Sequence, residues 1–329
     1  MLASVSFLSL ALWTSLAIAH SKNPKRGIGY AGDVPGDVIN ANQTNSIISW
    51  EYNWSNLPPD YLATSNLKYI PMQWGSVGID SFQDDVKAQG ADTILAFNEP
   101  DFVNESNMLP EDAAKLWIQF IQPLKSLGIR LGGPAVTASP TGRPWLTSFL
   151  QACTNCTIDF LPLHWYGSGT EGFYGYIWDV HTQFPQYPIW ITEYAETSTN
   201  DSVVLDFMNQ TITYLDTLTW IERYSWFGYF RPRPDVHYNL LRDDGGLNAL
   251  GELYTGAKTV HTQNITTGPT STYRTVNGAD NPTQAPATSW PALLNSAQSA
   301  RGPMASGLQL SFLAITLASG FFGVLWTTW

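Results

Sequence analysis

The chain has 329 residues, a net charge of −11 and two cysteines, and 13% of its residues are aromatic. The acidic balance argues against nucleic acid and anionic lipid headgroups as partners, because both would repel a negatively charged protein. It is compatible with a neutral substrate.

Both ends of the chain carry signals that we expect to be removed. Residues 1–19 are apolar and end in a small-x-small sequence, which predicts a secretory signal peptide with His20 as the first mature residue. Residues 296–329 follow a small-residue site at Asn295 and end in an apolar tail, which predicts a glycosylphosphatidylinositol (GPI) anchor signal. A single transmembrane helix is the alternative, since the tail is long enough to span a bilayer. Either way we expect the protein at the cell surface or in the cell wall.

The remaining chain divides into a folded part and a stalk. Residues 20–260 have the length of one domain with a large core, and 261–295 are rich in Ser, Thr and Pro, which predicts an O-glycosylated stalk. In an oxidising compartment Cys153 and Cys156 are predicted to form a local disulfide, with a redox or half-zinc site as the weaker alternatives. Sequons for N-glycosylation lie at Asn42, Asn53, Asn104, Asn155, Asn200, Asn209 and Asn264.

Apolar strands alternate with amphipathic segments along the folded part. Helical spacing is clearest at 110–127, where Pro110 precedes two acidic residues, and at 201–218. Eight strands alternating with helices predict an α/β fold, a (β/α)8 TIM barrel; a doubly wound sheet is the rival, but a dinucleotide-binding glycine motif is absent from the sequence. The predicted strands are 27–32, 48–54, 68–74, 93–98, 130–136, 159–166, 188–193 and 221–229.

Two glutamates close two of these strands. Glu99 follows the fourth strand and Glu193 ends the seventh, so both are expected at the carboxyl ends, where barrel active sites form. Barrel glycosidases of the large retaining clan carry an acid/base after strand four, in Asn-Glu, and a nucleophile after strand seven. On this pattern Glu99 is the general acid/base and Glu193 the nucleophile.

Further residues at strand ends are candidates for binding a sugar. Asn98 is placed to hydrogen-bond the 2-hydroxyl, although it could instead cap the turn before Pro100. His164 and Tyr166 end strand six and could orient the nucleophile or a sugar hydroxyl, with a core histidine as the alternative. Trp74 and Trp226 are candidate stacking platforms, and for each the alternative is barrel packing.

The motifs that contain these residues resemble glycoside hydrolase family 128, the largely fungal glycosyl hydrolase catalytic core group related to alkali-sensitive-linkage cell-wall proteins. The resemblance covers about 25–255. It implies a (β/α)8 fold, a retaining β-1,3-glucanase, and acid/base and nucleophile roles for the residues at 99 and 193. The motifs are Arg26-Gly-Ile-Gly-Tyr, Pro71-Met-Gln-Trp-Gly, Phe97-Asn-Glu-Pro-Asp, His164-Trp-Tyr-Gly, Trp190-Ile-Thr-Glu-Tyr and Tyr224-Ser-Trp-Phe-Gly.

The sequence therefore predicts a monomeric cell-surface endo-β-1,3-glucanase that acts on wall glucan through a glycosyl-enzyme intermediate, with transglycosylation where another sugar hydroxyl replaces water. We expect no cofactor and no metal, and a membrane contact only through the lipid anchor. The alternative is a wall protein that grips β-glucan without turning it over.

Overall fold

The computed structural model describes residues 21–30, 32, 34–42, 46–58 and 67–257. The predicted signal peptide, stalk and anchor signal, with His20, Asn264 and Asn295, lie outside the described residues. Within the described residues, no helix has the length and apolar character needed to cross a bilayer.

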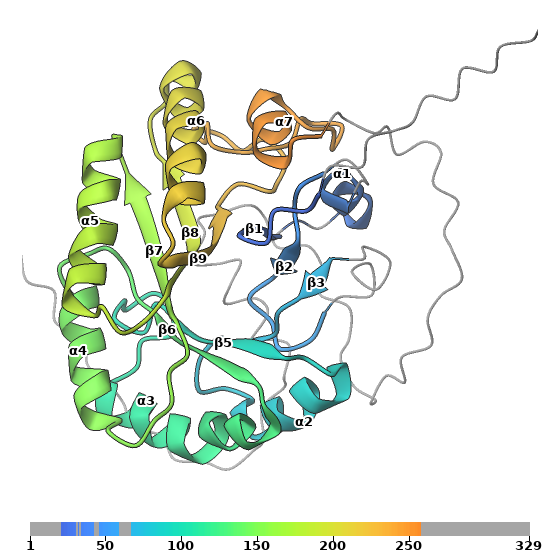
Figure 1. Ribbon diagram of the computed structural model, residues 1–329. Coiled ribbons are helices and arrows are strands. Elements are labelled where there is room, and N and C mark those ends of the chain that lie inside the picture. Colours follow the sequence, from blue (N-terminus) through green and yellow to red (C-terminus); the bar gives the residue numbers. More distant parts are fainter. Residues whose placement is uncertain (1–20, 31, 33, 43–45, 59–66, 258–329) are drawn as a thin grey trace, which may run out of the picture.

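Parallel strands form the centre of the molecule (Figure 1). Two of them, β3 and β4, are halves of one predicted strand, separated by Ile70 and Pro71; Pro71 has no N–H to donate to a ladder. The described strands therefore occupy eight positions, as predicted. They are β1 (Arg26–Gly29), β2 (Trp50–Tyr52), β3 (Lys68–Tyr69), β4 (Met72–Gln73), β5 (Thr93–Asn98), β6 (Arg130–Ala135), β7 (Leu161–Gly167), β8 (Ile189–Glu196) and β9 (Ile221–Trp226).

The strands close into a ring. One sheet has the order β3-β2-β1-β9-β8-β7 and the other has the order β4-β5-β6. The β3–β4 strand joins the two sheets at one side. At the other side, parallel bridges join Gly132 to Phe160 and Val136 to Leu163, and the His164 amide donates to the Val136 carbonyl at 3.2 Å. The predicted (β/α)8 barrel is confirmed.

The longer helices surround the strands, as Figure 1 shows for α2 to α6. Local signals fix their starts: Pro110 begins α3 with two acidic residues in its first turn, and the Asn200 side chain caps α6 by accepting from the Ser202 amide. The helices are α1 (Ile39–Asn42), α2 (Ile79–Gln89), α3 (Pro110–Leu116), α4 (Gly142–Ala152), α5 (Thr170–Gln183), α6 (Asp201–Thr217) and α7 (Ala249–Thr255), with a 3₁₀ turn η1 (Pro35–Val38) before α1.

The prediction of one continuous α-helix over 110–127 is wrong, because only the first part of this segment is α-helical. After α3 the chain makes a π-helical turn, η3 (Trp117–Ile121), and then a 3₁₀ segment, η4 (Gln122–Leu127). Pro123 explains the change, because proline cannot donate the backbone hydrogen bond that a continuing α-helix needs at this position. The apolar face is nevertheless buried, since Trp117 and Ile121 are fully enclosed.

Two hydrophobic clusters lie on the two sides of the strands. The larger one packs the strands against the helices. The smaller one combines side chains from strands around the ring, so it fills the barrel interior, and it is mostly aromatic: Trp190 stacks on Phe160 with ring centroids 3.9 Å apart and lies 5.6 Å from Trp50. Toward the carboxyl ends this inner layer continues into Tyr52 and Trp54. The candidate site therefore lies next to a closely packed layer of aromatic side chains in the barrel interior.

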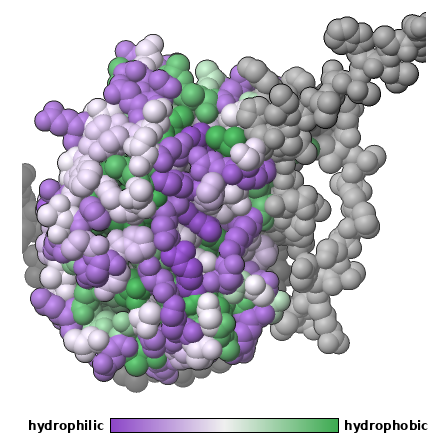
Figure 2. Space-filling model, viewed as in Figure 1, coloured by the Kyte–Doolittle hydropathy of each residue, from purple (hydrophilic) through white to green (hydrophobic). Residues whose placement is uncertain are grey.

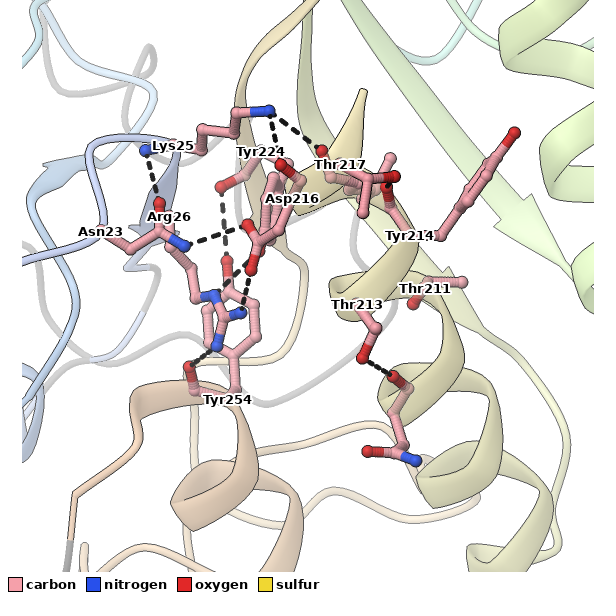
Figure 3. Close-up of polar contacts among 12 residues, drawn as sticks. Asn23, Lys25, Arg26, Thr211, Thr213, Tyr214, Asp216, Thr217, Tyr224 and Tyr254 are labelled. Carbon is pink, nitrogen blue, oxygen red and sulfur yellow. Dashed lines mark hydrogen bonds and ion pairs between the residues drawn. The ribbon is translucent and has the colours of Figure 1, made fainter. Parts of the chain in front are cut away.

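A buried polar cluster joins the first strand to the last helices at the amino end of the barrel (Figure 3). Arg26 is 5% exposed and pairs with Asp216 of α6 at 3.0 Å. Its guanidinium also donates to the Tyr224 hydroxyl and to the Tyr254 carbonyl, each at 2.9 Å. The residues that start and finish the barrel are thus held by one charge network.

Cys153 and Cys156 form a disulfide directly after α4, with their Cα atoms 5.2 Å apart.

On the molecular face drawn in Figure 2, hydrophilic residues predominate and hydrophobic residues occur in small separate patches. Such scattered apolar residues are ordinary for a protein surface.

Candidate active site

Glu99 and Glu193 lie together at the carboxyl ends of the strands. Glu99 directly follows β5, Glu193 lies in β8, and one carboxylate oxygen from each lies within 4.8 Å of the other. Their side chains are 14% and 7% exposed. Two carboxyl groups this close and this poorly solvated cannot both ionise freely, so one is suited to hold a proton while the other stays charged.

The backbone is distorted where these side chains leave the strands. Phe97 and Glu99 have φ angles of 48° and 40°, on either side of Asn98, and Trp54 after β2 has φ of 59°. Non-glycine residues in this region cost about 1–2 kcal/mol each. The β5–β6 register also shifts between Ala96 and Asn98. Such irregularities at strand ends re-aim side chains, here Asn98 and Glu99, away from regular alternation.

Two donors hold the Glu193 carboxylate. The Trp54 indole N–H donates to Oε1 at 2.7 Å, and the Tyr166 hydroxyl donates to Oε2 at 2.5 Å. Burial raises the pKa of Glu193, and the negative charge of Glu99 adds to this, whereas His164 and the two donors lower it. The hydrogen bonds therefore favour the charged form that a nucleophile requires.

His164 lies between the two glutamates and is 1% exposed. Its Nδ1 is 2.8 Å from Glu99 Oε1 and its Nε2 is 3.3 Å from Glu193 Oε1. Burial lowers the pKa of His164, but Glu193 and Glu99 outweigh it and raise the pKa to about 8. The imidazole hydrogen-bonds Glu99 through Nδ1, whereas Nε2 lies at ion-pair distance from Glu193 without forming a hydrogen bond among the described residues.

The same three side chains present donor atoms within 4.8 Å of one another and so form a set that could ligate a metal ion. Ligation needs a neutral imidazole, whereas the raised pKa of His164 favours the protonated form. Metal binding at this set would therefore have to displace the His164 proton.

Asn98 adjoins the pair from the β5 side. Its side-chain Nδ2 donates to Glu105 Oε2 at 3.0 Å, and its Oδ1 is buried with no hydrogen-bond partner among the described residues. A buried amide oxygen without a partner among the described residues is able to accept a hydrogen bond from a ligand.

The two tryptophans predicted as platforms differ. Trp74 follows β4 and is half-buried against the inner aromatic cluster. The Trp74 backbone carbonyl accepts a hydrogen bond from the Asn98 backbone N–H at 2.8 Å, so Trp74 adjoins the candidate site. Trp226 is wrong as a platform: its side chain is fully enclosed, packs on Tyr194 and Phe207, and donates to the Tyr238 carbonyl. The alternation of β9 turns Trp226 toward the helices, where it belongs to the core.

Sequence reasoning missed Trp54 and Glu105. Trp54 ends a predicted strand, so the rule that selected the two glutamates could also have selected it. Glu105 lies in a loop, with no periodic signal, and reaches the site only because the loop folds back.

Several predicted glycosylation sites are exposed in the structure, namely Asn104, Asn155, Asn200 and Asn209. Asn53 is half-buried and its Oδ1 accepts from the Tyr69 hydroxyl at 2.6 Å. The Asn42 side chain lies outside what the structure describes. Glycan occupancy at these positions stays a prediction.

Comparison with known proteins gives consistent matches. Residues 27–254 match the sequence model of the family described as "Glycosyl hydrolase catalytic core". The chain is 32% identical over 253 residues to alkali-sensitive linkage protein 1 of Schizosaccharomyces pombe. The aligned region covers 71% of this chain but only 45% of that protein. The chain thus spans less than half the length of that curated relative.

Solved structures of GH128 enzymes are also similar. A curdlan-specific exo-β-1,3-glucanase from Blastomyces gilchristii has 32% identity and a TM-score of 0.61, over 71% of this chain and 99% of that one. An endo-β-1,3-glucanase from Sorangium cellulosum has 29% identity and a TM-score of 0.61, over 71% and 98%. A variant endo-β-1,3-glucanase from Amycolatopsis mediterranei, in complex with laminarihexaose, has 30% identity and a TM-score of 0.59, over 71% and 100%.

Proposed function

The chain belongs to the glycosyl hydrolase catalytic core family, and from this premise we propose that it is a retaining endo-β-1,3-glucanase acting on cell-wall glucan. Its relatives of known structure are β-1,3-glucanases of both endo and exo type, and one of them holds a laminari-oligosaccharide. A β-1,3-glucan is therefore the substrate class that the comparisons support for this chain.

The observation that carries the retaining mechanism is the closeness of the two carboxyl groups, with oxygens of Glu99 and Glu193 within 4.8 Å. Retaining enzymes need about 5–5.5 Å between these groups, whereas inverting enzymes need roughly 6.5–9.5 Å to fit a water molecule between base and sugar. The separation supports direct attack by a carboxylate.

In this mechanism Glu99 and Glu193 act in two steps. A Glu193 oxygen attacks the anomeric carbon while Glu99 gives its proton to the departing glycosidic oxygen, so one C–O bond forms as the other breaks. Glu99 then takes a proton from water, which displaces Glu193. A glucan hydroxyl in place of water gives transglycosylation. His164 Nδ1 engages Glu99 Oε1, which leaves Oε2 of Glu99 to carry the proton.

The test compares laminarin cleavage by the wild type and by Glu193→Gln. We expect the wild type to release reducing ends and the variant to be slower by roughly 10³-fold or more, since an amide is not a nucleophile. Early products should carry the β-anomer in proton NMR spectra, and internal cleavage of laminarihexaose should mark the endo mode. Equal, near-zero release with retained laminarin binding would instead establish the glucan-binding alternative.

We also propose that the protein is secreted and held at the cell surface by a GPI anchor. The apolar segments at both ends of the sequence and the exposed sequons support this. Release of the protein from intact cells by a phosphatidylinositol-specific phospholipase is the expected result. Retention after that treatment would favour the transmembrane alternative.

A further inference from the structure

The loop that follows Glu99 folds back onto the end of β5. The Phe102 amide donates to the Glu99 carbonyl at 3.0 Å, and the Ser106 amide donates to the Asn98 carbonyl at 3.2 Å. This reversal places Glu105, seven residues along the chain, directly beside Asn98. The glutamate therefore reaches the site through loop geometry.

Glu105 makes one specific contact there, accepting at Oε2 from Asn98 Nδ2 at 3.0 Å. Asn98 is 2% exposed, so its amide cannot turn freely toward water. A carboxylate only accepts hydrogen bonds, so an ionised Glu105 fixes the NH₂ group of Asn98 toward itself. Oδ1 of Asn98 is then left as the buried acceptor without a partner among the described residues.

We propose that Glu105 is a positioning residue that sets the orientation of the Asn98 amide, and so decides whether the sugar hydroxyl beside the reacting carbon meets an acceptor or a donor. This rests on the proposed function and on the predicted hydrogen bond between Asn98 and the sugar 2-hydroxyl. Glu105 itself need not touch the sugar; it acts through Asn98.

The charges around Glu105 make this orientation depend on pH. Burial and the negative charges of Glu99 and Glu193 raise the pKa of Glu105, His164 and the Asn98 hydrogen bond lower it, and the net pKa is about 8. Below that pH Glu105 is a neutral acid, which can donate to Asn98 Oδ1 and so allow the amide to reverse. Above it, ionisation restores the one orientation in which NH₂ faces Glu105.

A double-mutant cycle tests whether Glu105 acts through Asn98. We expect Glu105→Ala to lower kcat/KM on laminarin about tenfold in the wild-type background but less than about twofold in Asn98→Ala, since coupled residues are non-additive. Glu105→Gln keeps an acceptor oxygen and should retain most activity at pH 6, and the inflection near pH 8 in its pH profile should shrink to the part that His164 contributes, whose pKa is also about 8. Glu111→Gln, an exposed acid in α3, is the matched control. Equal losses from Glu105→Ala in both backgrounds would overturn the proposal.

A readout that needs no activity separates this inference from the proposed function. In protein labelled with ¹⁵N-asparagine, the side-chain amide signal of Asn98, identified by its absence in Asn98→Ala, should titrate near pH 8. The titration should become clearly smaller in Glu105→Gln, where only His164 still titrates near pH 8, and should be unchanged in Glu111→Gln. An Asn98 signal that titrates identically in Glu105→Gln refutes the proposal. Absence of cleavage by the wild type, by contrast, refutes only the proposed enzyme.

Discussion

At the scale of single residues, the proposed nucleophile Glu193 depends on two donors, Trp54, two residues after β2, and Tyr166 in β7. Trp54 and Tyr166 each engage one oxygen of Glu193, at 2.7 and 2.5 Å. Hydrogen bonds to a charged group are worth about 1.5–3 kcal/mol. Both bonds favour the ionised carboxylate, against the burial that raises its pKa.

Replacing either donor should therefore slow the enzyme and shift its pH dependence. We expect Trp54→Phe and Tyr166→Phe each to lower kcat about 10–100-fold, the effect of one charge-assisted hydrogen bond. Loss of a donor raises the pKa of Glu193 further, and a nucleophile must be ionised, so the acid limb of kcat/KM should move to higher pH. Trp178→Phe, which removes an indole hydrogen bond to Tyr214 on the outer surface, is the control. An acid limb unchanged in both site variants would contradict this account.

The sequence identified the residues whose type and place are both unusual. A glutamate at the end of an apolar strand is such a signal, and it placed Glu99 and Glu193 correctly at the same end of the barrel. A tryptophan at a strand end is not such a signal, because the chain has 14 tryptophans and aromatic rings occur both in the core and in the candidate site. This ambiguity explains the missed Trp54 and the wrong assignment of Trp226, whose side in β9 depends on register.

At the scale of elements, Asp101 joins the loop after β5 to the loop after β6. Its Oδ1 accepts from the Thr137 amide at 3.0 Å, and its Oδ2 accepts from the hydroxyls of Thr137 and Thr141 at 2.5 and 2.9 Å. Asp101 lies two residues after Glu99, so these bonds also fix the backbone that presents the proposed acid/base.

We expect Asp101→Ala to lower the free energy of unfolding by about 2 kcal/mol, because it leaves partly buried donors without their acceptor. It should also lower kcat more than it changes KM, since displacing Glu99 affects the reaction more than binding. Urea unfolding and laminarin kinetics measure the two effects. The control is Asp84→Ala, whose exposed pair with Lys87 should contribute less than about 1 kcal/mol. A stable variant with normal kcat would show that the Asp101 bonds are dispensable.

Strand positions followed from the sequence because buried parallel strands are continuous apolar runs. The helices were harder to predict from the sequence. Between β1 and β2 the described chain makes only η1 and the four-residue α1. The helix predicted after β5 is α-helical only as far as Leu116 and continues as the π-helical η3 and the 3₁₀ η4. Loop conformation was not predictable at all, since the position of Glu105 depends on backbone bonds that leave no pattern in the sequence.

At the scale of the whole molecule, the barrel must hold its first and last segments together. The β1–β9 pairing does this through the backbone, and the Arg26 network does it through side chains (Figure 3). Lys25 adds bonds to the Leu215 and Leu218 carbonyls, at 3.1 and 2.8 Å, where α6 ends. A cation at this end of a helix is favourable because the helix dipole is negative there.

Arg26→Met should therefore destabilise the fold without impairing catalysis. Removing one partner of a buried charge network costs about 3–5 kcal/mol, and Asp216, whose side chain is 35% exposed, recovers part of this through water, so we expect about 3 kcal/mol. The network lies at the amino ends of the strands and Glu99 and Glu193 lie at the carboxyl ends, so kcat well below the new melting temperature should stay within about twofold. Thermal unfolding with parallel kinetics tests both statements. Arg143→Met, which breaks an exposed pair with Asp179 at 3.5 Å, should change stability by less than about 1 kcal/mol. Equal melting temperatures for the two variants would mean that backbone pairing alone closes this barrel.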